Sequence, residues 1–248
     1  MRRPTFFVSV SLVTLLALPA AAANAPLRHL AFAYDMSTTS TLERQGSGLA
    51  DSGGIASGSA IQRSTARQDN KGTIDADVVA ATGDGGLIVT TSEEGNERLA
   101  DTQVAIRSDG SLLTAPNAKL TDEQRYILTL LGRKIMPYST ALVGDSWQIS
   151  EAAGKGISDV ITFRITGVND PVVHLAVSRV IDNRTMGAYQ LSLTGTIDYD
   201  YKHLVPVAGN LQGITHYQNV DGLNTVQTLL TFSLAQDSFV GAGTKPNS

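Results

Sequence analysis

The sequence predicts a mainly β protein with a minor helical part: a large curved antiparallel sheet, of β-roll or half-barrel form, with one covering helix at about residues 121–131. Apolar and polar residues alternate along most of the chain, as in strands with one face on a core and the other in water. Glycine, serine and aspartate separate these runs at short intervals. Short links join antiparallel neighbours, because parallel strands need longer crossover connections. We therefore expect roughly ten to twelve strands.

The first residues have the order of a secretory signal peptide. Arg2 and Arg3 precede an apolar run at residues 6–18, and small residues follow at 20–25. The run is too short to cross a bilayer as a helix, which needs about 20 residues. We expect cleavage after Ala23, which leaves residues 24–248 as a single β-rich domain. A two-lobed division near residues 120–138 is the alternative.

The first part of the expected domain contains strands separated by turn residues. Residues 29–43 alternate and predict a long strand, and the Gly- and Ser-rich residues 46–58 predict a flexible loop. Residues 59–67 predict a polar strand, which ends in a turn at residues 69–72. Two hairpins then follow: 74–81 with 87–91 across the turn 83–86, and 102–107 with 111–114 across the turn 108–110.

One helix is expected after Thr121. Thr121 is a favourable N-cap, and Gln124 stands at the spacing of a capping box. The apolar stripe that would face the sheet is Ile127, Leu128, Leu130 and Leu131. Gly132 is a typical helix stop.

The remainder of the chain is expected to be strand. The expected strands are residues 161–165, 173–181, 186–202, 211–220 and 225–235, the last two joined by a turn at Asp221 and Gly222. In the clearest of them, Tyr189, Leu191, Leu193, Ile197, Tyr199 and Tyr201 share one face. Asp198 and Asp200 fall on the opposite face, where we expect exposed carboxylates.

Composition excludes several classes of partner and anchor. The chain has 19 Lys plus Arg against 23 Asp plus Glu, and removal of Arg2 and Arg3 with the signal peptide makes it more acidic. It lacks the basic face that nucleic-acid binding requires. The chain has no cysteine, which excludes disulfides and a lipid-modified cysteine. We expect no transmembrane segment in the mature chain, and a soluble protein in the periplasm or outside the cell.

Three short motifs resemble the blocks of the GDSL esterase family. They are Gly144-Asp145-Ser146, Gly167-Val168-Asn169-Asp170 and Asp200-Tyr201-Lys202-His203. The resemblance implies Ser146 as nucleophile, His203 as base and Asp200 as the group that orients the histidine. That family has a parallel α/β fold, which differs from the antiparallel sheet expected here. We therefore predict no catalytic residues, and treat Ser146 with His203 as the alternative.

The segment from Met136 and Pro137 to Trp147 has a second resemblance. It is similar to a segment of uncharacterised exported bacterial β-rich proteins, in which a proline precedes Gly-Asp-Ser/Thr-Trp by several residues. From the residues alone, Gly144 and Asp145 predict a turn that leads into a strand. Trp147 is the only tryptophan of the chain and is expected to anchor that strand to the core.

The sequence predicts no metal ligands and no cofactor-binding residues. The four histidines are not spaced as a ligand set. The glycines at 83–86 lack the lysine and the following helix of a phosphate loop.

These observations lead to one expected function and two alternatives. We expect an exported, non-catalytic protein of the bacterial cell envelope, with an apolar or lipid-like ligand in a groove of the sheet. The analogy is with the half-barrel lipoprotein carriers of bacterial envelopes, at the level of fold alone. The alternatives are a secreted esterase-like hydrolase and an outer-membrane β-barrel, which amphipathic strands would also fit.

Overall fold

The structure is a computed structural model that describes residues 26–45, 61–96, 98–108, 110–115, 118–131, 135, 142–151, 157–183 and 189–241. The predicted signal peptide at residues 1–23, the predicted loop at 46–58, and Met136 and Pro137 lie outside these ranges. Within them, no helix combines the length and apolar character needed to cross a membrane.

Eleven strands form one antiparallel sheet, which confirms the predicted fold class. The strands are β1 Arg28–Gln45, β2 Ile61–Ala81, β3 Leu87–Glu94, β4 Arg98–Ile106, β5 Leu112–Thr114, β6 Ser146–Glu151, β7 Ile157–Asn169, β8 Val172–Asn183, β9 Tyr189–Asp200, β10 Val205–Asn219 and β11 Gly222–Asp237. Helix α1 spans Asp122–Leu128, and a short helix α2 spans Ser238–Gly241.

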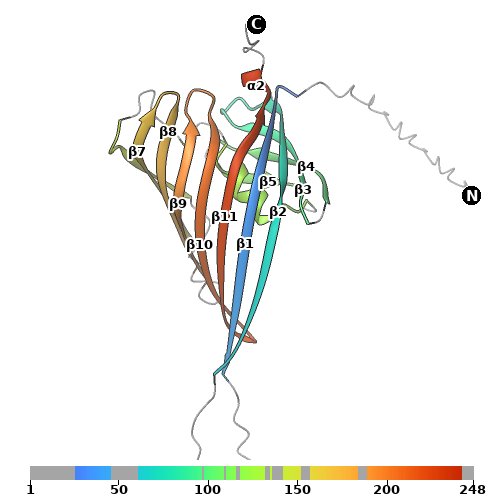
Figure 1. Cartoon of the computed structure of the whole chain (residues 1–248), viewed down its shortest axis with the longest axis vertical. Helices are drawn as coiled ribbons and strands as arrows, with labels where there is room; N and C mark the ends of the chain where they lie inside the picture. The colour runs from blue at the N-terminus through green and yellow to red at the C-terminus, as the bar shows by residue number, and fades with distance from the viewer. Residues whose placement is uncertain are drawn as a thin grey trace, which may run out of the picture.

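Neighbouring strands of the sheet are consecutive in the chain, except for the central pair of β1 and β11. The order runs β5-β4-β3-β2-β1-β11-β10-β9-β8-β7-β6, so the first and last strands pair at the centre and β5 and β6 lie at the two ends. The sheet is open, and it curves around α1 (Figure 1). The segment 115–145, which contains α1, links the two end strands. Strands β1 to β5 precede this segment and β6 to β11 follow it. The two groups form one sheet because β1 pairs directly with β11.

Glycines occupy turn positions that require a positive φ. The 82–86 turn closes with hydrogen bonds between Thr82 and both Gly85 and Gly86, and Gly85 has a φ of 86°. Gly222 opens β11 with a φ of 143°, and a Cβ there would stand 2.1 Å from the Glu43 carbonyl oxygen. Only glycine fits both requirements.

The turn predicted at residues 69–72 is wrong. These residues continue β2 and pair with β1, with Asp69 opposite Ser37 and Gly72 opposite Tyr34. Their side chains are also satisfied in the strand: Asp69 accepts from Arg67, and Asn70 donates to Glu123. Pairing with a neighbouring strand therefore overrides local turn propensity.

Helix α1 begins as predicted and ends earlier than predicted. Thr121 is the N-cap, and the capping box with Gln124 is present. The helix ends at Leu128, not near residue 131, because Leu130 and Leu131 donate to carbonyls only three residues back, in tight turns. Both leucines nevertheless remain buried.

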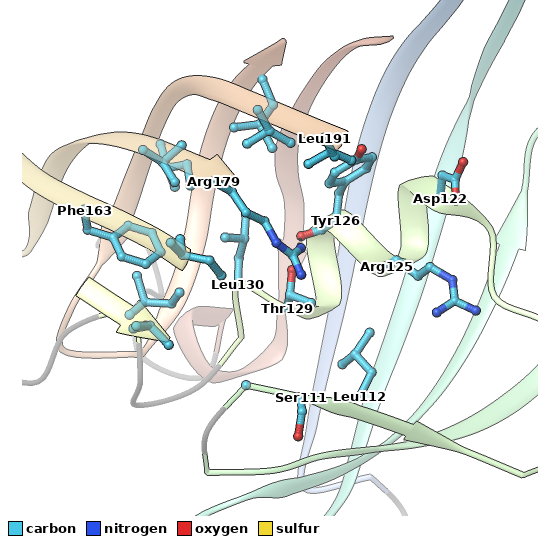
Figure 2. A pocket seen from close by; sticks show the side chains of 18 residues that line it. Ser111, Leu112, Asp122, Arg125, Tyr126, Thr129, Leu130, Phe163, Arg179 and Leu191 are labelled. Atoms are coloured by element: carbon cyan, nitrogen blue, oxygen red, sulfur yellow. Dashed lines mark hydrogen bonds between the residues drawn. The ribbon is translucent and has the colours of Figure 1, made fainter. Parts of the chain in front are cut away.

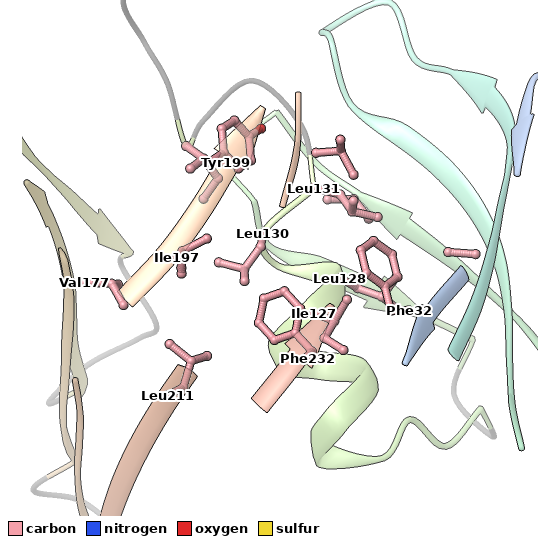
Figure 3. Packing of buried hydrophobic residues seen from close by; sticks show 14 of the residues in the cluster. Phe32, Ile127, Leu128, Leu130, Leu131, Val177, Ile197, Tyr199, Leu211 and Phe232 are labelled. Carbon is pink, nitrogen blue, oxygen red and sulfur yellow. The ribbon is translucent and has the colours of Figure 1, made fainter. Parts of the chain in front are cut away.

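The core lies between α1 and the face of the sheet that curves around it. Ile127 and Leu128 are completely buried and lie beside Phe32 and Phe232 from the two central strands (Figure 3). The two phenylalanine rings meet edge to face at 6.4 Å. Leu130 lies toward Ile197 of β9 (Figure 3). The helix therefore contacts strands from both halves of the sheet.

Strands β1, β2, β10 and β11 extend beyond the other strands at one end of the sheet (Figure 1). β2 pairs with β3 only from Thr73 to Ala81, and the first nine residues of β2 are all exposed. The described part of this extension has no core of its own, so the packed body of the molecule lies at the other end of these strands.

Candidate ligand-binding cavity

A cavity of about 360 Å³ lies between α1 and the inner face of the sheet (Figure 2). Its lining residues are Gly110, Ser111, Leu112, Asp122, Arg125, Tyr126, Thr129, Leu130, Ile135, Ile149, Ile161, Phe163, Val177, Arg179, Leu191, Leu193, Ile197 and Leu211. The volume falls in the range of about 300–1,000 Å³ that is typical of small-molecule sites.

Strands β6 to β10 form one wall of this cavity, which is apolar except for Arg179 of β8. Residues from the same strand stand an even number of positions apart, so they share one face of the sheet. The register places Ile149 opposite Ile161, and Phe163 opposite Val177. Gly195 follows in the same row, opposite both Val177 and Leu211, and adds no side chain to the wall. The alternation read from the sequence therefore produces this surface directly.

Helix α1 and the turn before β5 supply most of the polar part of the lining. Asp122, Arg125, Tyr126 and Thr129 come from the helix and its C-cap, and Ser111 comes from the turn (Figure 2). Asp122 and Arg125 are exposed, whereas Tyr126 is partly buried. The cavity is thus apolar along the sheet and polar along one side of the helix.

One charged pair stands inside the apolar wall. The Arg179 guanidinium donates to both carboxylate oxygens of Asp159, at 3.0 and 2.6 Å. The Asp159 side chain is only 5% exposed. Two parallel charge-assisted hydrogen bonds fix the guanidinium and balance its charge.

Tyr126 is held neutral at the edge of the cavity. Burial, and after it the nearby Asp122 carboxylate, raise the pKa of Tyr126 to about 12. The phenol is protonated at neutral pH, as in any tyrosine, and the raised pKa keeps it a hydrogen-bond donor at higher pH as well.

A buried polar cluster fixes the start of α1 against the sheet. Glu93 of β3 accepts from the Tyr34 hydroxyl and, at 2.6 Å, from the hydroxyl of Thr121. Glu123 accepts from Asn70 at 2.8 Å. Glu93 and Glu123 are only 3% and 4% exposed. The sequence interpretation missed this cluster, although Glu93 stands at an inward position, four residues after Val89 and two after Thr91.

The residues of the esterase alternative do not meet. Ser146 is exposed at the start of β6 and lies opposite Arg164 of β7. Arg164 in turn lies opposite Ala176 of β8, and Ala176 lies opposite Thr196 of β9. Two strands therefore separate Ser146 from β9, the strand that precedes the turn with His203. Three strand spacings of about 4.8 Å make about 14 Å of lateral separation between Ser146 and that strand.

Asp200 and His203 form a local pair instead. The Asp200 carboxylate contacts the His203 ring at 2.6 Å and also accepts from the backbone N–H groups of Lys202 and His203. Arg28 donates to the carbonyl of His203 at 2.6 Å. The expectation that Asp200 is exposed is wrong, because its carboxylate is folded back over the turn and the residue is only 9% exposed. Asp198, by contrast, is partly exposed and contacts His174 at 2.6 Å.

Trp147 packs as the sequence predicts. Gly144 has a φ of 99°, and the chain then enters β6. The Trp147 ring stacks on Phe163 at 5.6 Å, and Phe163 lines the cavity. The tryptophan therefore reports on the environment of that wall.

Among the residues that the structure describes, no group of three or more histidine, cysteine, aspartate or glutamate side chains could hold a metal ion. The chain matches no protein-family model, and no curated protein matches its sequence. Function must therefore be inferred from the geometry of this chain.

Proposed function

We propose that this protein is an exported, non-catalytic binding protein that holds an apolar or lipid-like ligand between α1 and the inner face of the sheet. The observation that carries the proposal is the wall of β6 to β10, apolar except for Arg179, which faces a cavity of about 360 Å³. A cavity walled by aliphatic and aromatic side chains favours an apolar occupant.

The energetics require a ligand with an extended apolar part. Each buried methylene contributes about 0.8 kcal/mol, and association costs at least about 4 kcal/mol. A ligand must therefore bury more than about five methylenes before binding becomes favourable. An acyl chain satisfies this condition.

A binding role is favoured over hydrolysis because the lining of the cavity does not include Ser146, Asp200 or His203. Arg179, which does line it, is paired with Asp159. Export is proposed from the signal-peptide pattern that ends at Ala23.

The test fills the cavity and leaves the opposite face as a control. Val177 lines the cavity, whereas Val180 of the same strand is 50% exposed on the other face. We expect the purified protein to bind a fluorescent fatty-acid probe, with Val177→Trp weakening binding at least tenfold and Val180→Trp leaving it unchanged. Failure of the wild type to bind the probe, or equal binding by both variants, would contradict the proposal.

A further inference from the structure

The cavity has two chemically different ends. One end is the apolar wall of β6 to β10. The other holds Ser111, Asp122 and Arg125, at the turn before β5 and along α1 (Figure 2). A ligand that matched both ends would carry an apolar chain and a polar head.

The two arginines of the lining differ in their partners. The Arg179 guanidinium is bound on two sides by the buried Asp159 carboxylate. Arg125 is exposed, and its guanidinium has no hydrogen-bond or ion-pair partner among the described residues. Arg125 is therefore the cation of this cavity that is left to interact with a ligand.

The neighbouring Asp122 does not cancel the attraction of Arg125 for an anionic group. It stands in the first turn of α1, where the helix dipole and the free N–H groups stabilise a negative charge. Arg125 stands one turn later, near the C-terminal end of this short helix. A planar guanidinium at the open side of an apolar cavity is suited to bind a carboxylate by two parallel hydrogen bonds.

We propose that the ligand is a single-chain amphiphile with an anionic head, of the long-chain carboxylate class, with its chain on the β6–β10 wall and its head at Arg125. This inference rests on the proposed function and specifies the ligand of that site. Tyr126 lines the same cavity and, with its raised pKa, adds no negative charge to it.

The test compares two ligands that share a chain and differ in the head. Isothermal titration of the full mature chain with dodecanoate and with dodecanol is expected to show tighter binding of dodecanoate. Arg125→Gln is expected to weaken dodecanoate binding about tenfold, since one charge-assisted contact is worth roughly a factor of ten in affinity. The same variant should leave dodecanol binding unchanged.

A matched control removes an arginine elsewhere. Arg164 is exposed on β7, on the face opposite the cavity, and Arg164→Gln changes the net charge equally. It should leave both affinities unchanged. Equal binding of the two ligands, or equal effects of the two arginine variants, would overturn the anionic-head inference and leave the apolar cavity intact. Binding of neither ligand would overturn the proposed function itself.

Discussion

The clearest stability prediction concerns Glu93, which joins the sheet to the start of α1. The change is Glu93→Ala. It removes the acceptor of the Tyr34 hydroxyl, which belongs to a residue that is only 5% exposed, and one partner of Thr121. Thr121 keeps its hydrogen bond from the Gln124 backbone, so the main loss is at Tyr34.

The expected change in the free energy of unfolding follows from these lost hydrogen bonds. A buried hydroxyl left without its acceptor costs about 1–3 kcal/mol. The lost contact to Thr121 adds about 1 kcal/mol, as is typical of a hydrogen bond within a folded protein. We expect the free energy of unfolding to fall by about 2–4 kcal/mol. Urea unfolding followed by circular dichroism measures this loss. The slope of the free energy of unfolding against urea concentration should be the same for the variant and the wild type.

A double-mutant cycle separates the contact from general damage. Tyr34→Phe removes the donor, and the double variant removes both partners, so the double variant should lose about 1–2 kcal/mol less than the sum of the single variants. Glu94→Ala is the matched control, because Glu94 is the next residue and is exposed; it should change the free energy of unfolding by no more than about 0.5 kcal/mol. Additive single variants, or equal losses from Glu93→Ala and Glu94→Ala, would refute the reasoning.

Two further predictions rest on the structure and one on the sequence. Because Trp147 stacks on Phe163 of the cavity wall, saturating dodecanoate should change the tryptophan emission; emission that stays constant while calorimetry reports binding would contradict this. Because burial raises the pKa of Tyr126 to about 12, the unfolded state loses this proton first as pH rises, so the contribution of Tyr126 to stability should be complete below pH 10 and lost between about pH 10 and 12. Chemical unfolding of wild type and Tyr126→Phe across that interval tests it, and identical pH slopes would contradict it. Cleavage after Ala23 predicts a mature chain that begins at Asn24, measured by intact mass of the exported product; an uncleaved mass would contradict export through this signal.

Much of the fold could be predicted because its signals are local. The alternation through Leu191, Leu193 and Ile197 predicted one face of β9, and all three are buried. Thr121 and Gln124 lie within one turn of each other, so their capping box was readable as well. Such features depend on neighbours in sequence, which a single chain displays completely.

The features that were missed depend on distant partners. Residues 69–72 have the composition of a turn, and only pairing with β1, more than thirty residues away along the chain, makes them strand. Glu93 looks like a surface carboxylate until Tyr34 and Thr121 surround it. The cavity also depends on the curvature of the sheet around α1, which brings the turn before β5 and the wall of β6 to β10 to one space. No local pattern specifies that meeting.

The central claim is that the space between α1 and the sheet holds an apolar ligand. Native mass spectrometry of the wild type and Val177→Trp, each purified from the original host without detergent, tests it most directly. The account predicts a co-purified mass on the wild type, released under denaturing conditions as an acyl-chain compound, and its loss from the variant. A wild-type protein that carries no ligand and takes up no added amphiphile would contradict the claim.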